Sequence, residues 1–221
     1  PDLLPRFQKD PEYRVVQAPA CWGYRLLFNM QDHAVFQQRE VRQAIQYAID
    51  KEEPVEKIAR GAAVPGSPGV LPVDHILYNP AVAYQGPDLD RARQLLDQAG
   101  FNAVDDGNVR RNEVGEELAF TFLVGGGAEV RIGEVLKEQL ARVGIQLTVK
   151  SVDRKTRDTI VRENDYQLAL LGHGGWGGDA DYLRERFGDQ PKGGLSPSAS
   201  RLHGYENAEL LALLNEQYTT I

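Results

Sequence analysis

The fold of this chain is decided by the stretch Leu168-Ala169-Leu170-Leu171-Gly172-His173-Gly174-Gly175-Trp176-Gly177-Gly178-Asp179. Its first four residues are apolar and end at a glycine, a pattern that predicts a buried strand. The glycine-rich continuation places a histidine, a tryptophan and an aspartate directly after that strand. Ligands of open α/β sheets bind outside the carboxyl ends of the strands. We therefore expect half of a small-molecule binding cleft here, with Asp179 as its charged anchor.

A continuous run of predicted strands and helices leads into this stretch. It consists of the strands Leu118–Val124, Ile145–Val149 and Leu168–Leu171 and the helices Ala128–Val143 and Asp153–Glu163. Short links in a β-α-β-α-β order imply parallel strands with helices covering the sheet. The glycines at 125–127 superficially resemble a phosphate cradle, but the Lys-Ser/Thr pair of a P-loop is missing, which excludes nucleotide binding there.

The rest of the sequence predicts further strands and helices around this core. We expect strands at Tyr13–Gln17 and Tyr24–Asn29, helices at Gln38–Asp50, Glu52–Gly61, Pro87–Ala99, Ala180–Phe187 and Tyr205–Tyr218, and a loop or hairpin tip at Asp105–Glu117. Apolar residues on one stripe of the Gln38–Asp50 helix predict the face that it buries.

Composition excludes several classes of function. The 221-residue chain has a formal net charge of −7, with basic residues interleaved among acidic ones, so nucleic acid is not an expected partner. It has no run of about 18 apolar residues, which a membrane-spanning helix needs. A single cysteine, Cys21, excludes an internal disulfide framework and a multi-cysteine metal site.

Three motifs together are similar to one known family. They are Leu27-Phe28-Asn29 with the later segment Arg39–Lys51 (REVRQAIQYAIDK), Asp90–Phe101 (DRARQLLDQAGF), and Gly175–Asp179 (GWGGD). In these motifs the chain resembles the extracellular solute-binding proteins of ABC importers, family 5, which bind peptides, dipeptides or nickel. The resemblance runs over nearly the whole chain.

The resemblance implies an α/β fold, a lobe like those of type II periplasmic binding proteins, with a mixed sheet whose β-α-β-α-β core is flanked by helices. Residues 1–221 are expected to form a single lobe, the C-terminal ligand-binding lobe of a two-lobed protein. The N-terminal lobe and the final return segment are expected to be absent from this stretch.

The function implied is capture of peptides or similar cationic or zwitterionic solutes, and their delivery to an ABC permease in the membrane. The location implied is periplasmic or extracellular. No catalysis, cofactor or metal is expected. The alternative within the resemblance is a ligand-sensing domain of a cytoplasmic transcription regulator built on the same fold.

The expected ligand-binding residues are Asp179, Trp176, Gly175, His173 and Trp22. In peptide-binding members of the family, the aspartate that matches Asp179 holds the peptide α-amino group. Some members carry a basic residue at the position of His173, where it meets a ligand carboxylate. Trp176 offers a flat apolar wall for the ligand.

Each of these residues also has a structural interpretation. Asp179 suits the N-cap of the following helix, and Trp176 could be wedged in the core below the loop. His173 could be a histidine satisfied within its loop, and Trp22 could have an ordinary packing role. A hydrolase that uses Asp179 with His173 lacks a placed nucleophile and an oriented triad.

Overall fold

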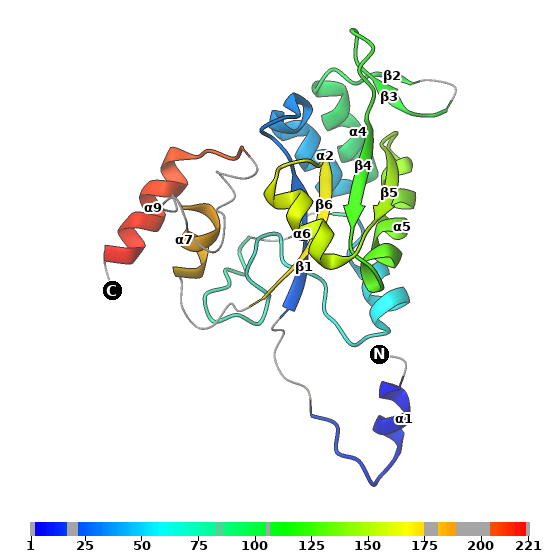
Figure 1. Cartoon of the computed structure of the whole chain (residues 1–221), viewed down its shortest axis with the longest axis vertical. Coiled ribbons are helices and arrows are strands. Elements are labelled where there is room, and N and C mark those ends of the chain that lie inside the picture. Colours follow the sequence, from blue (N-terminus) through cyan, green and yellow to red (C-terminus); the bar gives the residue numbers. More distant parts are fainter. Residues whose placement is uncertain are drawn as a thin grey trace.

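The computed structural model describes residues 3–16, 22–82, 84, 86–104, 107–174, 181–188 and 204–219. Its strands are β1 (Trp22–Phe28), β2 (Ala103–Val104), β3 (Arg110–Arg111), β4 (Ala119–Val124), β5 (Gln146–Ser151) and β6 (Leu168–Gly174). Its α-helices are α1 (Leu4–Lys9), α2 (Arg39–Ala48), α3 (Glu52–Pro54), α4 (Leu89–Gln98), α5 (Ala128–Ala141), α6 (Arg154–Arg162), α7 (Asp181–Phe187) and α9 (Ala208–Thr219). A 3-10 helix, η1 (Ala34–Gln37), and a π-helical segment, η2 (Val55–Ala59), complete the set (Figure 1).

The main sheet is mixed and has the strand order β1-β6-β4-β5. Strand β4 pairs in parallel with both β5 and β6, which confirms the predicted β-α-β-α-β core. Strand β1 pairs with β6 in the antiparallel direction, with Trp22 opposite Gly174 and Phe28 opposite Leu168. The first residues of β1 therefore lie beside the carboxyl end of β6.

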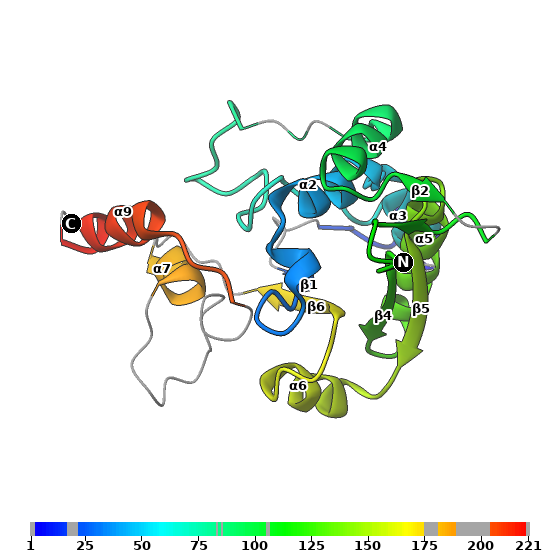
Figure 2. The same ribbon diagram turned by 90° about the horizontal axis from the view of Figure 1, so that it is seen from above.

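Helices cover both faces of this sheet. Figure 2 shows α2, α4 and α5 on one side of the strands and α6 on the other, while α7 and α9 lie beyond the β1 edge. The larger core lies under α2, α4 and α5 and includes the fully buried Phe36, Leu96 and Phe122. A smaller core on the other face contains Leu27 of β1 and Val161 of α6. Successive side chains of a strand point to opposite faces of the sheet, so the strands contribute residues to both cores.

Local sequence explains where the helices begin and end. The Asp88 side chain accepts a hydrogen bond from the Arg91 backbone N–H and caps α4, which lies within the predicted Pro87–Ala99 helix. Gly100 follows α4 with a φ of 88°, a left-handed value that glycine adopts at little cost. The apolar stripe predicted for α2 is buried in full; it comprises Val41, Ala44, Ile45 and Ala48.

A buried amide ties the end of β1 to the start of β6. Asn29 is completely buried, and its Nδ2 donates to the backbone oxygens of Asn164 at 3.0 Å and Tyr166 at 2.8 Å. Tyr166 lies just before the start of β6, so these bonds join the end of β1 to the start of β6. This end of the strand pair is the one farthest from the carboxyl end of β6. Asn29 of the Leu27–Asn29 motif is therefore a structural residue.

Two sequence predictions differ from the structure. The strand predicted at Tyr13–Gln17 is wrong over residues 13–16, which have no regular structure, and Val16 there is 75% exposed. The β-branched pattern has no partner strand in the described part of the chain, and propensity alone does not form a sheet. The Glu52–Gly61 helix is interrupted, because α3 passes into η2 and ends at the left-handed Arg60.

No helix within the described ranges combines the length and the hydropathy that crossing a membrane would need.

Candidate functional site

A cavity of about 300 Å³ lies beside strands β1 and β6. It is bordered by the start of β1, the end of β6, one face of α5 and the irregular segment 64–73. The pairing of Gly23 with His173 brings these two chain segments together. The cavity therefore lies beside β6, the strand after which the sequence pattern predicts a ligand.

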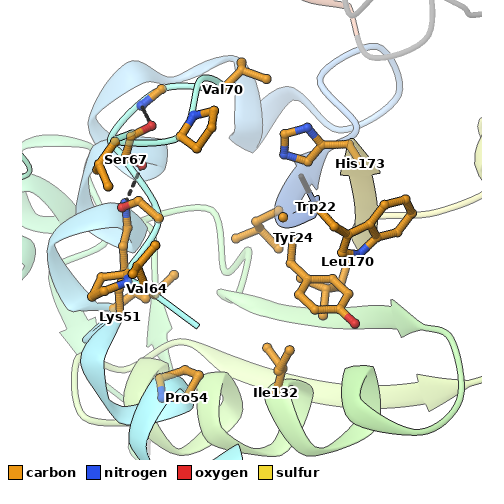
Figure 3. Close-up of a pocket in the computed structure, with 18 of the residues that line it drawn as sticks. Trp22, Tyr24, Lys51, Pro54, Val64, Ser67, Val70, Ile132, Leu170 and His173 are labelled. Atoms are coloured by element: carbon orange, nitrogen blue, oxygen red, sulfur yellow. Dashed lines mark hydrogen bonds between the residues drawn. The ribbon is translucent and has the colours of Figure 1, made fainter. Parts of the chain in front are cut away.

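Two aromatic side chains of β1 form one wall of this cavity. Trp22 is 58% exposed and Tyr24 is 40% exposed, and both point to the same face of the sheet because they are two residues apart. Figure 3 shows them side by side, facing Lys51 and the segment that contains Ser67 across the cavity. A side chain at Gly172 would collide with the Trp22 indole, so this glycine makes room for the ring.

Lys51 stabilises the opposite wall of the cavity. Lys51 Nζ donates to the backbone oxygens of Gly66 at 3.1 Å and Ser67 at 2.8 Å. The same ammonium lies 4.1 Å from the centre of the Tyr84 ring, a cation–π distance. Burial lowers the pKa of Lys51 to about 8. Lys51 therefore holds the irregular segment 64–73 over the cavity with carbonyl and aromatic contacts.

The chemistry of the cavity suits the binding of apolar groups. Its lining is mainly apolar and aromatic, with residues such as Leu26, Val70 and Ile132 between the two walls. Small-molecule sites are typically apolar cavities in which a few polar groups fix the orientation of the ligand. The arrangement supplies a surface for apolar side chains or rings of a solute.

The polar end of the cavity is formed by His173. This residue is 8% exposed, and its Nδ1 lies 3.1 Å from the Tyr182 hydroxyl. Burial, followed by the charges of Arg25 and Arg186, lowers the pKa of His173 to about 4. The imidazole is therefore neutral at pH 7. It lies within β6 and not in a loop, and its contact with Tyr182 is of the kind expected for a satisfied histidine.

The sequence-predicted site residues divide into two groups. Trp22 and His173 both line the cavity, although they are far apart in the chain. Gly175, Trp176 and Asp179 follow β6 and lie outside the described residues. Their roles toward a ligand stay predictions. Among the residues that are described, no group of three or more His, Cys, Asp or Glu side chains could hold a metal ion.

Sequence reasoning missed Tyr24, Lys51 and the segment 64–73 as parts of this site. The alternation along Trp22-Gly23-Tyr24 could have predicted an aromatic wall, because it places both aromatic rings on one face of a strand. Lys51 follows a helix motif, and its contact with Ser67 depends on the path of an irregular segment. Local pattern does not specify that path.

A buried ion pair supports the neighbouring strand end. Glu129 of α5 and Arg157 of α6 are 2% and 5% exposed and form a salt bridge beneath the end of β4. The Glu129 carboxylate also accepts from the Gly125 backbone N–H at 2.7 Å. That amide therefore already has an anionic partner, which agrees with the exclusion of a phosphate cradle at residues 125–127.

Comparison with solved structures defines the class of fold. The chain superposes on the oligopeptide-binding protein AppA from Bacillus subtilis, solved in complex with a nonapeptide, with a TM-score of 0.75 and 20% identity. The match covers 97% of this chain and 42% of AppA. The fold is thus that of a periplasmic binding protein, with a mixed sheet flanked by helices.

Comparison with sequence families defines the family. The model described as bacterial extracellular solute-binding proteins, family 5 Middle, matches residues 1–194. The chain therefore belongs to the family 5 bacterial extracellular solute-binding proteins.

Two relatives of this chain have names that refer to different ligands. Heme-binding protein A of Haemophilus influenzae is 25% identical over 221 residues, which is 96% of this chain and 37% of the relative. Di/tripeptide-binding protein 4 of Pseudomonas aeruginosa is 28% identical over 187 residues, covering 82% of this chain and 32% of the relative. The chain thus spans well under half the length of the proteins that it matches.

Proposed function

We propose that this chain is one ligand-binding lobe of the solute-binding component of an ABC importer. The single observation that carries the proposal is the apolar, aromatic-walled cavity beside strands β1 and β6 in a chain of this family. In this proposal residues 1–221 form the C-terminal lobe, and a second lobe of the complete protein faces it across the solute. The protein works outside the cytoplasmic membrane, in the periplasm or at the cell exterior.

A solute that enters the cavity exchanges its contacts with water for contacts with protein groups that are already in place. Trp22 and Tyr24 give a solute apolar area that is already held in place, so little side-chain freedom is lost on binding. Closure of the two lobes removes the remaining water and strengthens polar contacts inside the cleft. The closed form then meets the membrane permease, and the solute leaves chemically unchanged.

Asp179 is the anchor for a positively charged group of the solute. A carboxylate that is shielded from water makes charge-assisted bonds to an ammonium worth roughly 1.5–3 kcal/mol. Peptides are the solute class that we propose, because an aspartate at this position suits an α-amino group. The names of the relatives support this class, since they include a di/tripeptide-binding protein and an oligopeptide-binding protein with a bound nonapeptide.

The test uses the complete protein and an equimolar mixture of di- and tripeptides, with capture followed by native mass spectrometry. We expect bound peptides of unchanged mass. Asp179→Asn should weaken peptide binding by about tenfold or more, in line with the loss of one charge-assisted bond. Asp90→Asn is the matched control, because the side chain of Asp90 is 88% exposed on α4.

Three results would count against the proposal. Capture of no peptide from the mixture would refute peptides as the solute class. Equal affinities for the Asp179→Asn variant and the unchanged protein would leave this aspartate as a helix cap. Release of hydrolysed peptide would favour the hydrolase interpretation over transport.

A further inference from the structure

Segment 64–73 forms one wall of the cavity, although it has little structure of its own. All of its residues lie within the described ranges, and they form no helix or strand. Pro65, Pro68 and Pro72 have no backbone N–H to donate, so the segment cannot build a regular hydrogen-bond ladder. None of these residues is buried, and none belongs to either hydrophobic core. The segment therefore depends on another part of the chain for its position.

Lys51, at the N-cap of α3, makes that connection. Its ammonium donates to two consecutive backbone oxygens in the middle of the segment, those of Gly66 and Ser67. Such charge-assisted hydrogen bonds are roughly twice as strong as bonds between neutral groups. The Tyr84 ring lies against the same ammonium, and the Tyr84 hydroxyl donates to the Ile49 backbone oxygen. The aromatic partner of Lys51 is thus itself bonded to the chain just after α2.

The chain around Lys51 is fixed to helix α5. Gln139 is completely buried, and its side-chain amide makes two hydrogen bonds with the backbone of Asp50, each 3.1 Å long. The same amide donates to the Glu53 carboxylate at 2.6 Å. Helix α5 also contributes Ile132 to the cavity lining. Lys51 therefore joins the helical part of the lining to the irregular wall.

The wall that Lys51 holds faces the aromatic side chains of β1. Trp22 and Tyr24 lie on one side of the cavity, and Val64 and Val70 lie on the other (Figure 3). Ligand cavities in proteins typically have volumes of about 300–1,000 Å³, so a cavity of about 300 Å³ is a small one. A short outward movement of one wall would therefore change which groups the cavity can hold.

We propose that Lys51 is a positioning residue for solute binding, whose ammonium holds segment 64–73 at a fixed separation from the aromatic wall. This inference rests on the proposed solute-binding function and adds how the same cavity selects among solutes. A wall that is already fixed favours groups that fill the space beside it, because no loop has to be ordered on binding. The group selected is a flat apolar side chain, since the facing surfaces are aromatic and aliphatic.

The test measures how much affinity an aromatic side chain adds. The complete protein is titrated by calorimetry with Ala-Phe-Ala and Ala-Ala-Ala at pH 7, where Lys51 is mainly charged because its pKa is about 8. The unchanged protein should bind Ala-Phe-Ala about tenfold or more tightly, as burial of the phenyl ring predicts. Lys51→Met should reduce this ratio to about threefold or less, because a loosened wall must be ordered on binding. Its affinity for Ala-Ala-Ala should stay within about twofold.

Three further variants separate positioning from general damage. Lys51→Arg keeps a charged group that can donate to both carbonyls and lie over Tyr84, so its ratio should stay within about twofold of the unchanged value. Tyr84→Leu leaves the hydrogen bonds but removes the ring, and should give an intermediate ratio. Lys137→Met is the matched control, because the Lys137 side chain is 48% exposed and pairs with Glu134 on α5. It should leave both affinities unchanged.

Limited proteolysis tests the wall without any solute. Thermolysin cleaves before large apolar residues, so the bonds before Val70 and Leu71 report how often the segment leaves its place. Lys51→Met should raise cleavage at these bonds by about fivefold or more, whereas Lys51→Arg and Lys137→Met should not. Far-UV circular dichroism establishes that each variant is folded. If Lys51→Met does not fold, Tyr84→Leu serves for the same comparison.

The outcomes separate this inference from the proposed function. If the unchanged protein binds neither tripeptide, peptide capture is refuted, and the cleavage rates alone decide whether Lys51 holds the wall. Equal binding of the two tripeptides by the unchanged protein would overturn the role of Lys51 in selection and leave peptide capture standing. The inference would also be overturned by an equal loss of both affinities in Lys51→Met, or by cleavage as slow as in the unchanged protein.

Discussion

The Glu129–Arg157 pair offers the sharpest test of how a buried ion pair stabilises the end of strand β4. We consider Glu129→Gln, which keeps the shape of the side chain and its acceptor for the Gly125 N–H but removes the charge. Both partners are almost fully buried, with side chains 2% and 6% exposed. Removal of one member of such a pair leaves the other as a buried charge and typically costs about 3–5 kcal/mol.

The other contacts of Arg157 determine where in that range the loss of unfolding free energy should lie. Arg157 also pairs with Asp158 at 2.8 Å, but that carboxylate is 49% exposed and is screened by water. Its bond to the Leu170 oxygen, at 3.3 Å, is long. These contacts compensate part of the charge, so we expect a loss of about 3 kcal/mol in the free energy of unfolding. Domains of this kind are stable by only about 5–15 kcal/mol, so the loss should be large and easily measured.

Urea denaturation followed by circular dichroism measures this loss. Glu134→Gln on the same helix is the matched control, because its pair with Lys137 at 3.3 Å joins side chains that are about half exposed. That control should cost less than about 0.5 kcal/mol. The double variant Glu129→Gln with Arg157→Met should recover at least half of the loss, since removal of both charges leaves none buried. Equal effects of Glu129→Gln and Glu134→Gln would refute the reasoning.

Three more predictions concern the cavity. Gly172→Ala should displace the Trp22 ring, shift the tryptophan emission and weaken solute binding in the complete protein; an unchanged spectrum would contradict the close contact. Lys51 has a folded-state pKa of about 8, below its ordinary value of 10.5, so the folded state releases its proton first and stability should rise between these pH values. Urea midpoints should show this rise in the unchanged protein and not in Lys51→Met. His173 has a pKa of about 4, so its NMR signals should not titrate between pH 5 and 8. A midpoint near 6.5, the ordinary histidine value, would show that burial and the nearby arginines do not lower its pKa.

The core of this fold was predictable because its information is local. From Leu118 to Leu171, apolar runs, glycine stops and an amphipathic helix follow one another with short links, and only parallel pairing satisfies that order. The cap at Asp88 is equally local, since one side chain meets a backbone N–H three residues on. Where a pattern needs a distant partner, the prediction failed, as with the strand expected at Tyr13–Gln17.

The site was predictable only in outline for the same reason. The carboxyl end of β6 could be located, but the register that sets Trp22 beside Gly174 joins segments from opposite ends of the chain. Lys51 looks unremarkable in the sequence, because its bonds to the backbone oxygens of Gly66 and Ser67 depend on the path of an irregular segment.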